Sequence, residues 1–225
     1  MLPSSCSHIS FNLTESHENI LLTNEIFLGS TVNTDNTMQE KIKERIAVGN
    51  KAFFANKNIF RSKLISKNAK LKFYFSVIRP VVTCACETWI LKETITNILM
   101  VFERKVLRKI FGPTYENGSW RIKTNQELDT LIKHKNIINF ARVQRLGWYG
   151  HIERMQETRM VRTIHAWKPI SKRPMGRPRI RWEDDVKKDI QRLKVSNWKT
   201  LVQDRRRWKE VVGKAKTALR VVEPY

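Results

Sequence analysis

Residues 94–111 read TITNILMVFERKVLRKIF and indicate the fold more clearly than any other stretch. Apolar side chains recur there at intervals of three or four residues, at Ile95, Leu99, Phe102, Val106 and Ile110. This spacing places apolar side chains on one face of a helix, where they can be buried. Gly112 and Pro113 follow directly, and this pair typically ends a helix. We therefore predict an amphipathic helix from about Thr94 to Phe111.

Similar patterns precede this helix. A short strand that enters a turn is predicted over residues 24–30, and a helix from Met38. Ser66 is placed to cap a second helix, and Pro80 is expected to kink or end it because the proline ring removes a backbone donor. The predicted buried positions are Ile42, Ile46, Gly49 and Phe53 in the first helix and Leu71, Phe75 and Ile78 in the second.

Further helices are predicted towards the C-terminus. Thr124 and Glu127 have the spacing of a capping box, and another helix is expected from about Asn136 to Tyr149. Residues 168–181 are rich in proline and basic side chains and favour an extended linker, after which two short helices follow. The predicted buried positions are Leu128, Leu131 and Ile132, then Ile137, Phe140, Ala141 and Trp148, then Trp182, Val186, Ile190 and Leu193, and last Trp198, Leu201, Val202, Trp208 and Val212.

These patterns predict a mainly α protein with a short N-terminal strand or hairpin, a helical bundle, a Pro-rich basic linker and small C-terminal helices. We divide the chain into residues 1–23 as an irregular N-terminal segment, 24–36 as an edge strand and turn, 37–113 as a helical bundle, 114–167 as a second helical segment, 168–181 as the basic Pro/Gly linker and 182–225 as C-terminal helices.

The chain is strongly basic. It has 43 Lys and Arg against 21 Asp and Glu in 225 residues, a formal net charge of +22. Residues 151–225 hold more than half of this excess, and five of the seven tryptophans lie in or just before that range. Such a charge favours a polyanionic partner, above all nucleic acid, and disfavours a neutral metabolic enzyme with a small-molecule substrate. The rings suit base stacking, although most are expected to anchor helices in the core.

No catalytic residue, metal ion or cofactor is expected in this chain. The acidic pair Asp184-Asp185 falls in the first turn of a predicted helix, where carboxylates interact favourably with the helix dipole. Cys84 and Cys86 lack a matching pair of metal ligands, and the eight glycines form no phosphate-binding loop.

The cellular compartment is predicted to be nuclear or cytoplasmic. The chain has three cysteines, which favours a reducing compartment, and its first residues have none of the features of a secretory signal. No run approaches the roughly 18 apolar residues of a membrane span. We expect an intracellular protein with no membrane partner, and the sequence leaves its oligomeric state open.

The segment 172–181, KRPMGRPRIR, holds the most specific local motif. Its core, Gly176-Arg177-Pro178-Arg179, resembles the AT-hook, a short segment that binds the minor groove of DNA. Proline keeps such a backbone extended, so that the flanking arginines can lie in a narrow A·T groove of enhanced negative potential. A basic linker that contacts phosphates without sequence preference is the alternative.

Several short motifs follow one another in a distinctive order. They are Phe27-Leu28-Gly29-Ser30, Ile42-Lys43-Glu44-Arg45-Ile46, Ile78-Arg79-Pro80, Cys86-Glu87-Thr88-Trp89, Phe102-Glu103-Arg104-Lys105-Val106-Leu107-Arg108, Arg145-Leu146-Gly147-Trp148-Tyr149-Gly150-His151 and Gly176-Arg177-Pro178. In this order they resemble the carboxy-terminal part of the reverse transcriptases of non-LTR (LINE-type) retrotransposons. The resemblance covers about residues 25–210.

The resemblance implies that Phe27-Leu28-Gly29 is the last strand at the edge of the palm domain and that the following helices form the thumb. The thumb of such enzymes holds the primer–template duplex, and the basic tail helps to bind RNA or target DNA. Full-length relatives are RNA-directed DNA polymerases that would use Mg²⁺ at an aromatic-x-Asp-Asp turn, a motif that this sequence lacks. We therefore predict a catalytically incomplete remnant of such an enzyme.

Three hypotheses stay open at this point: a remnant that binds nucleic acid without sequence preference, a host-captured minor-groove binder, and an active polymerase whose upstream half was missed in gene prediction. The genomic DNA just 5′ of the reading frame separates the third from the others. The residues expected to bind nucleic acid are Lys41, Lys43, Arg45, Lys51, Arg104, Lys105, Arg108, Lys109, Arg142 and Arg145 in the helices, and Lys172, Arg173, Arg177, Arg179, Arg181, Arg205 and Arg206 in the tail.

Overall fold

The computed structural model describes residues 25–27, 30–32, 38–133, 135–167 and 180–218. The chain divides into two units, Met1–Thr37 and Met38–Tyr225. In the first unit, strands β1 (Glu25–Phe27) and β2 (Ser30–Val32) pair in antiparallel fashion, with Ile26 opposite Thr31. This confirms the predicted short N-terminal hairpin.

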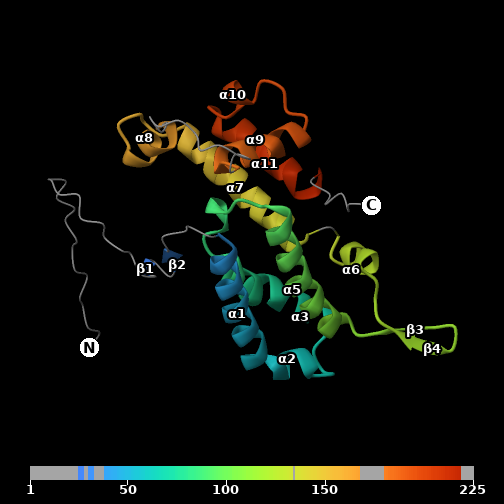
Figure 1. Ribbon diagram of the computed structural model, residues 1–225. Coiled ribbons are helices and arrows are strands. Elements are labelled where there is room, and N and C mark those ends of the chain that lie inside the picture. The colour runs from blue at the N-terminus through green and yellow to red at the C-terminus, as the bar shows by residue number, and fades with distance from the viewer. Residues whose placement is uncertain (1–24, 28–29, 33–37, 134, 168–179, 219–225) are drawn as a thin grey trace. The chain divides into compact units, whose positions relative to one another are not determined.

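The second unit is mainly helical, which confirms the predicted fold class (Figure 1). Among its described residues one further pair of strands forms a hairpin between α5 and α6. The elements are α1 (Met38–Ala55), α2 (Lys57–Arg61), α3 (Lys67–Phe73), the π-helical turn η1 (Tyr74–Ile78), α4 (Arg79–Val82), the 3₁₀ turn η2 (Cys86–Thr88), α5 (Glu93–Phe111), β3 (Thr114–Glu116), β4 (Ser119–Arg121), α6 (Asn125–Leu131), α7 (Ile137–Glu153), α8 (Met160–Ala166), α9 (Trp182–Arg192), α10 (Trp198–Leu201) and α11 (Arg205–Ala218).

A first core cluster joins α1, α2, η1, α4, α5, α6 and the first turns of α7, with partly buried side chains of α3 packed against it. Ile42, Ile78 and Leu99 are fully buried in it. Gly49 allows α1 to approach its neighbours closely, because a Cβ atom there would lie 2.3 Å from Val82 Cγ2 and 3.3 Å from the Phe102 ring. The predicted apolar stripes of α1 and α5 therefore face each other in one packed interior.

A second core cluster forms where the later turns of α7 meet α9, α10 and α11. Leu146 and Tyr149 of α7 pack there with Val186 and Trp208. The Trp208 indole N–H donates to the carbonyl oxygen of Leu146 at 2.9 Å. Helix α7 thus contributes residues to both clusters.

The helix caps follow the predicted chemistry. The Ser66 hydroxyl accepts a hydrogen bond from the Ala69 N–H at the start of α3. Thr124 and Glu127 form the full capping box of α6, in which each side chain accepts from the backbone N–H of the other residue. Both caps confirm predictions made from spacing alone.

Around Pro80 the helical path changes type. The π turn η1 directly precedes the short helix α4 that contains Pro80, and the helical path ends at Val82, two residues after the proline. A π turn in a helical path accommodates such a local irregularity. The π turn also shifts the buried face, so that Tyr74 is fully buried where Phe75 was expected.

Other buried positions were also predicted wrongly. Leu131 is 43% exposed, because the two turns of α6 bury only the narrow face that carries Leu128, with Ile132 following. Trp148 is only half-buried, and its neighbour Tyr149 takes the buried position on α7. Residues 1–23, and 168–179 of the predicted linker, lie outside the described residues. No helix in the described part of the chain is long and apolar enough to cross a membrane.

Candidate nucleic-acid interface

The helices position the predicted basic residues in three different environments, of which the first is the protein interior. Arg145 is 1% exposed and Arg142 is 9% exposed. Arg145 donates to Asp185 Oδ2 at 2.5 Å and to Asp189, and Arg142 Nε lies 3.5 Å from Asp189 Oδ1. The prediction that Arg142 and Arg145 contact nucleic acid is therefore wrong, since both arginines pair with carboxylates inside the protein.

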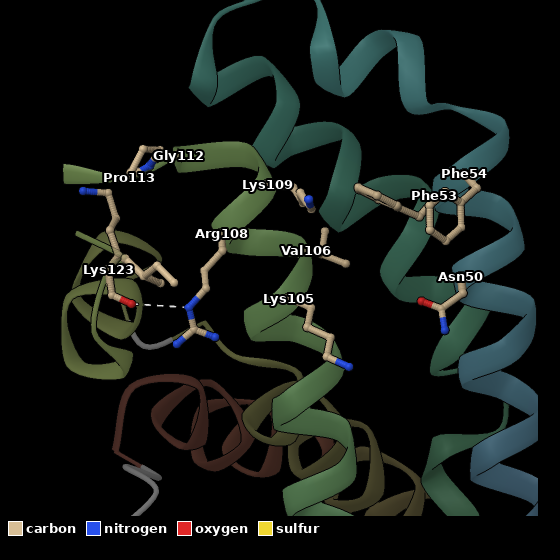
Figure 2. Close-up of a pocket in the computed structure, with 11 residues that line it drawn as sticks. Asn50, Phe53, Phe54, Lys105, Val106, Arg108, Lys109, Gly112, Pro113 and Lys123 are labelled. Carbon is tan, nitrogen blue, oxygen red and sulfur yellow. Dashed lines mark hydrogen bonds between the residues drawn. The ribbon is translucent and has the colours of Figure 1, made fainter. Parts of the chain in front are cut away.

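The second environment is a groove of about 440 Å³ between α1 and the end of α5 (Figure 2). Helix α1 supplies the side chains of Asn50, Phe53 and Phe54. Helix α5 supplies Lys105, Val106, Arg108 and Lys109, and the residues that follow it supply Gly112, Pro113, Ile122 and Lys123. Of these described lining residues four are cationic and none is acidic. The structure thus brings together Lys105, Arg108 and Lys109, three of the residues expected to bind nucleic acid.

Two of the four cations of this groove, Arg108 and Lys123, have neutral partners. Arg108 donates through Nε to the Lys123 carbonyl oxygen at 3.3 Å and through Nη2 to the Asn125 side-chain oxygen at 2.8 Å. The Lys123 ammonium donates to the Thr114 hydroxyl. Neutral acceptors orient these side chains without cancelling their charge, so the groove keeps a positive potential that attracts anions.

The apolar side of the groove is partly open to solvent. Phe54 is 64% exposed and Ile122 is 73% exposed, whereas Phe53 and Val106 are buried. In Figure 2 the Lys105 side chain lies between Arg108 and the Asn50 of α1. A groove that combines cations with exposed apolar and aromatic surface suits phosphate groups together with the flat faces of bases.

The third environment is the remaining surface. Lys43 is exposed and lies seven residues before Asn50, which places it on the groove face of α1. Lys51 is also exposed, whereas Lys41 and Arg45 are half-buried on other faces of α1 and Arg104 is half-buried on α5. Arg181, Arg205 and Arg206 are exposed around α9 and α11, and Lys172, Arg173, Arg177 and Arg179 lie outside the described residues.

Sequence reasoning missed the β3–β4 hairpin that borders the groove, and with it Ile122 and Lys123. The signal was present, because Asn117 and Gly118 form the Asn-Gly pair that favours a two-residue hairpin turn. Both residues have positive φ angles, 51° and 79°, as a type I′ turn requires.

An ion-pair cluster fixes the hairpin to α6. Arg121 pairs with Glu116 at 2.5 Å and with Glu127 at 2.6 Å. Hydrogen bonds from Arg121 and from the Thr124 backbone lower the pKa of Glu127 to about 2. One face of the hairpin is therefore held against the start of α6.

The described residues do not fit a magnesium site of the kind that a polymerase uses. No group of three His, Cys, Asp or Glu side chains in the described part of the chain is placed to hold a metal ion. In the acidic pair, Asp185 accepts hydrogen bonds from Arg145 and from the Leu91 N–H, which agrees with the structural role expected for it.

Comparison with known proteins shows one informative similarity. The chain is 25% identical over 198 residues to a Caenorhabditis elegans protein described as an uncharacterized transposon-derived protein. The match covers 85% of this chain and 71% of that protein. No protein-family model and no solved structure matches the chain. The similarity supports a transposon-related origin.

Proposed function

We propose that this chain is a catalytically incomplete remnant of a non-LTR retrotransposon reverse transcriptase and that it binds nucleic acid through its thumb-like helices and basic tail. The observation that supports this proposal best is the groove between α1 and α5, whose described lining holds four cations and no carboxylate. The transposon-related origin and the formal net charge of +22 agree with it.

The groove suits a phosphate backbone for a physical reason. Lys105 and Lys109 lie four residues apart, so they stand one above the other on the same face of α5. When such lysines contact phosphates, the counterions condensed on the nucleic acid are released. This release drives binding without regard to base sequence. We therefore propose binding to the backbone of DNA or of an RNA–DNA hybrid with little sequence preference.

A salt titration tests this function. Binding of the chain to a fluorescent DNA duplex and to an RNA–DNA hybrid is measured by anisotropy at several salt concentrations. Roughly six to ten phosphate contacts give a slope of about −5 to −9 for log K against log salt. A slope near zero, or incorporation of nucleotides by the chain alone, would contradict the proposal.

A second candidate function is minor-groove binding by a host-captured protein, and it rests on the sequence Gly176-Arg177-Pro178-Arg179. Arginines beside a proline would then read the narrow groove of A·T-rich DNA. This function predicts that A·T-rich duplex competes better than G·C-rich duplex and that Arg177→Ala removes the difference. Equal competition by the two duplexes would leave only backbone binding.

A further inference from the structure

The β3–β4 hairpin exposes two large aromatic rings. Tyr115 and Trp120 are directly opposite each other in the antiparallel register. Their ring centroids are 5.1 Å apart with planes inclined at 58°, and the residues are 60% and 71% exposed. Aromatic surface of this size is normally buried, so a pair left in solvent marks a surface that meets a partner.

The aromatic pair faces away from α6. Side chains alternate between the two faces of a strand, and Arg121 points to the face that pairs with Glu116 and Glu127. Trp120 therefore lies on the opposite face, together with its cross-strand partner Tyr115. Ile122 and Lys123, which directly follow β4, line the groove, so the hairpin that carries the two rings is joined directly to the groove lining.

We propose that the Tyr115–Trp120 pair is a stacking platform for unpaired bases and that the hairpin and the groove together bind a single-stranded segment of nucleic acid. This inference rests on the proposed nucleic-acid binding and names the form of nucleic acid that the site takes. The phosphates of the segment lie against Lys105, Lys109 and Lys123, and its bases stack on the two hairpin rings.

Charge and geometry favour this ligand. Bases inside a duplex are stacked on one another and present only their edges, so an exposed ring stacks well only on a base that is unpaired. The hairpin that carries the rings is joined through Ile122 and Lys123 to a groove whose described lining has cations and no carboxylate, which complements a polyanion. Phe54, 64% exposed on the α1 side of the groove, offers a further ring to the same strand.

Anisotropy titrations with two probes test the platform, a fluorescent 15-nucleotide single strand and a blunt duplex with the same label. We expect Trp120→Leu to weaken single-strand binding about tenfold or more and to leave duplex binding nearly unchanged, because it removes the ring but keeps apolar bulk. Trp120→Phe, which keeps a ring, should restore most of the affinity. The matched control is Trp167→Leu, which changes an exposed tryptophan after α8 and should alter neither affinity.

The outcomes separate this inference from the proposed function. If the unaltered chain binds neither probe at low salt, both proposals are wrong. If it binds both and Trp120→Leu does not weaken the single strand, or weakens both probes equally, only the platform is wrong. Loss of affinity in Trp120→Phe equal to that in Trp120→Leu would also contradict stacking. If neither Trp120→Leu nor Trp120→Phe changed the binding of either probe, the platform would be wrong and the two rings would instead be a contact surface for a protein.

Discussion

The Arg145 guanidinium of α7 and the Asp185 carboxylate of α9 lie 2.5 Å apart although 40 residues separate them in sequence. Arg145 also donates to the Trp89 carbonyl oxygen at 3.1 Å and to Asp189. Asp185 in turn accepts from the Leu91 N–H at 2.8 Å. This buried cluster therefore ties α9 to α7 and to the segment between η2 and α5.

The cluster makes Arg145 important for stability. We expect Arg145→Met to lower the free energy of unfolding by about 3–5 kcal/mol, because it leaves the buried Asp189 and the half-buried Asp185 without their main cationic partner. Urea unfolding at pH 7, followed by circular dichroism, measures the change. Arg206→Met is the matched control, since Arg206 is exposed on α11, and its effect should stay within about 0.5 kcal/mol. Equal losses in the two variants would contradict this role.

A second buried carboxylate predicts a pH dependence. Glu103 of α5 is 3% exposed and accepts from the Tyr74 O–H and from the Ile137 N–H, both at 2.9 Å. Burial raises its pKa to about 7, although these hydrogen bonds and the nearby Arg79 oppose the rise. Because the pKa is higher in the folded state, the folded protein favours the protonated carboxyl. Protonated Glu103 therefore adds to the free energy of unfolding. This contribution is fully present below about pH 4.5 and is lost as the pH rises through 7.

Replacing Glu103 by glutamine should remove this dependence. We expect the free energy of unfolding of the unaltered chain to fall, relative to that of Glu103→Gln, by on the order of 2–3 kcal/mol between pH 4 and pH 8. Urea unfolding at a series of pH values measures the difference. Glu93→Gln changes an exposed residue on the same helix, and this variant should show the same pH dependence of the free energy of unfolding as the unaltered chain. A constant difference between Glu103→Gln and the unaltered chain would show that Glu103 does not titrate in this range.

Two glycines of α7 provide a matched pair of substitutions. A Cβ atom at Gly150 would lie 2.0 Å from the Trp208 indole nitrogen, whereas a Cβ at Gly147 would meet no atom within 4 Å. We expect Gly150→Ala to destabilise the protein by about 1–3 kcal/mol, because the buried ring must move. Gly147→Ala should stabilise it by about 0.5–1 kcal/mol through helix propensity. Thermal unfolding of both variants tests the close approach of α11 to α7, and similar effects would contradict it.

The sequence predicts the helices that carry periodic apolar stripes, because periodicity depends only on neighbours along the chain. Ile42 and Leu99 are buried as expected, and the caps at Ser66 and Thr124 form. The role of Arg145 could not be predicted in this way. Its partner Asp185 is distant in sequence, and no local pattern shows that an arginine in a basic chain is enclosed by other helices.

The sequence predicted some of the basic residues of the groove but not the groove itself. Lys105 and Lys109 were among the residues expected to bind nucleic acid, and their four-residue spacing places them on one face of α5. The Tyr115–Trp120 pair lies on a hairpin of only a few residues, and Ile122 and Lys123 directly follow it; the Asn-Gly turn is the one local signal of this hairpin. That α1, the end of α5 and the residues after the hairpin together form the groove depends on tertiary packing.

The groove itself gives the last prediction. We expect the double variant Lys105→Ala/Lys109→Ala to make the slope of log K against log salt for duplex DNA less steep by about 2, because two phosphate contacts are lost. The control is Lys63→Ala/Lys67→Ala, which removes two exposed lysines outside the groove and lowers the net charge of the chain equally. If binding depended only on net charge, both variants would change the slope alike. A change confined to the groove variant would show that the phosphates lie against α5.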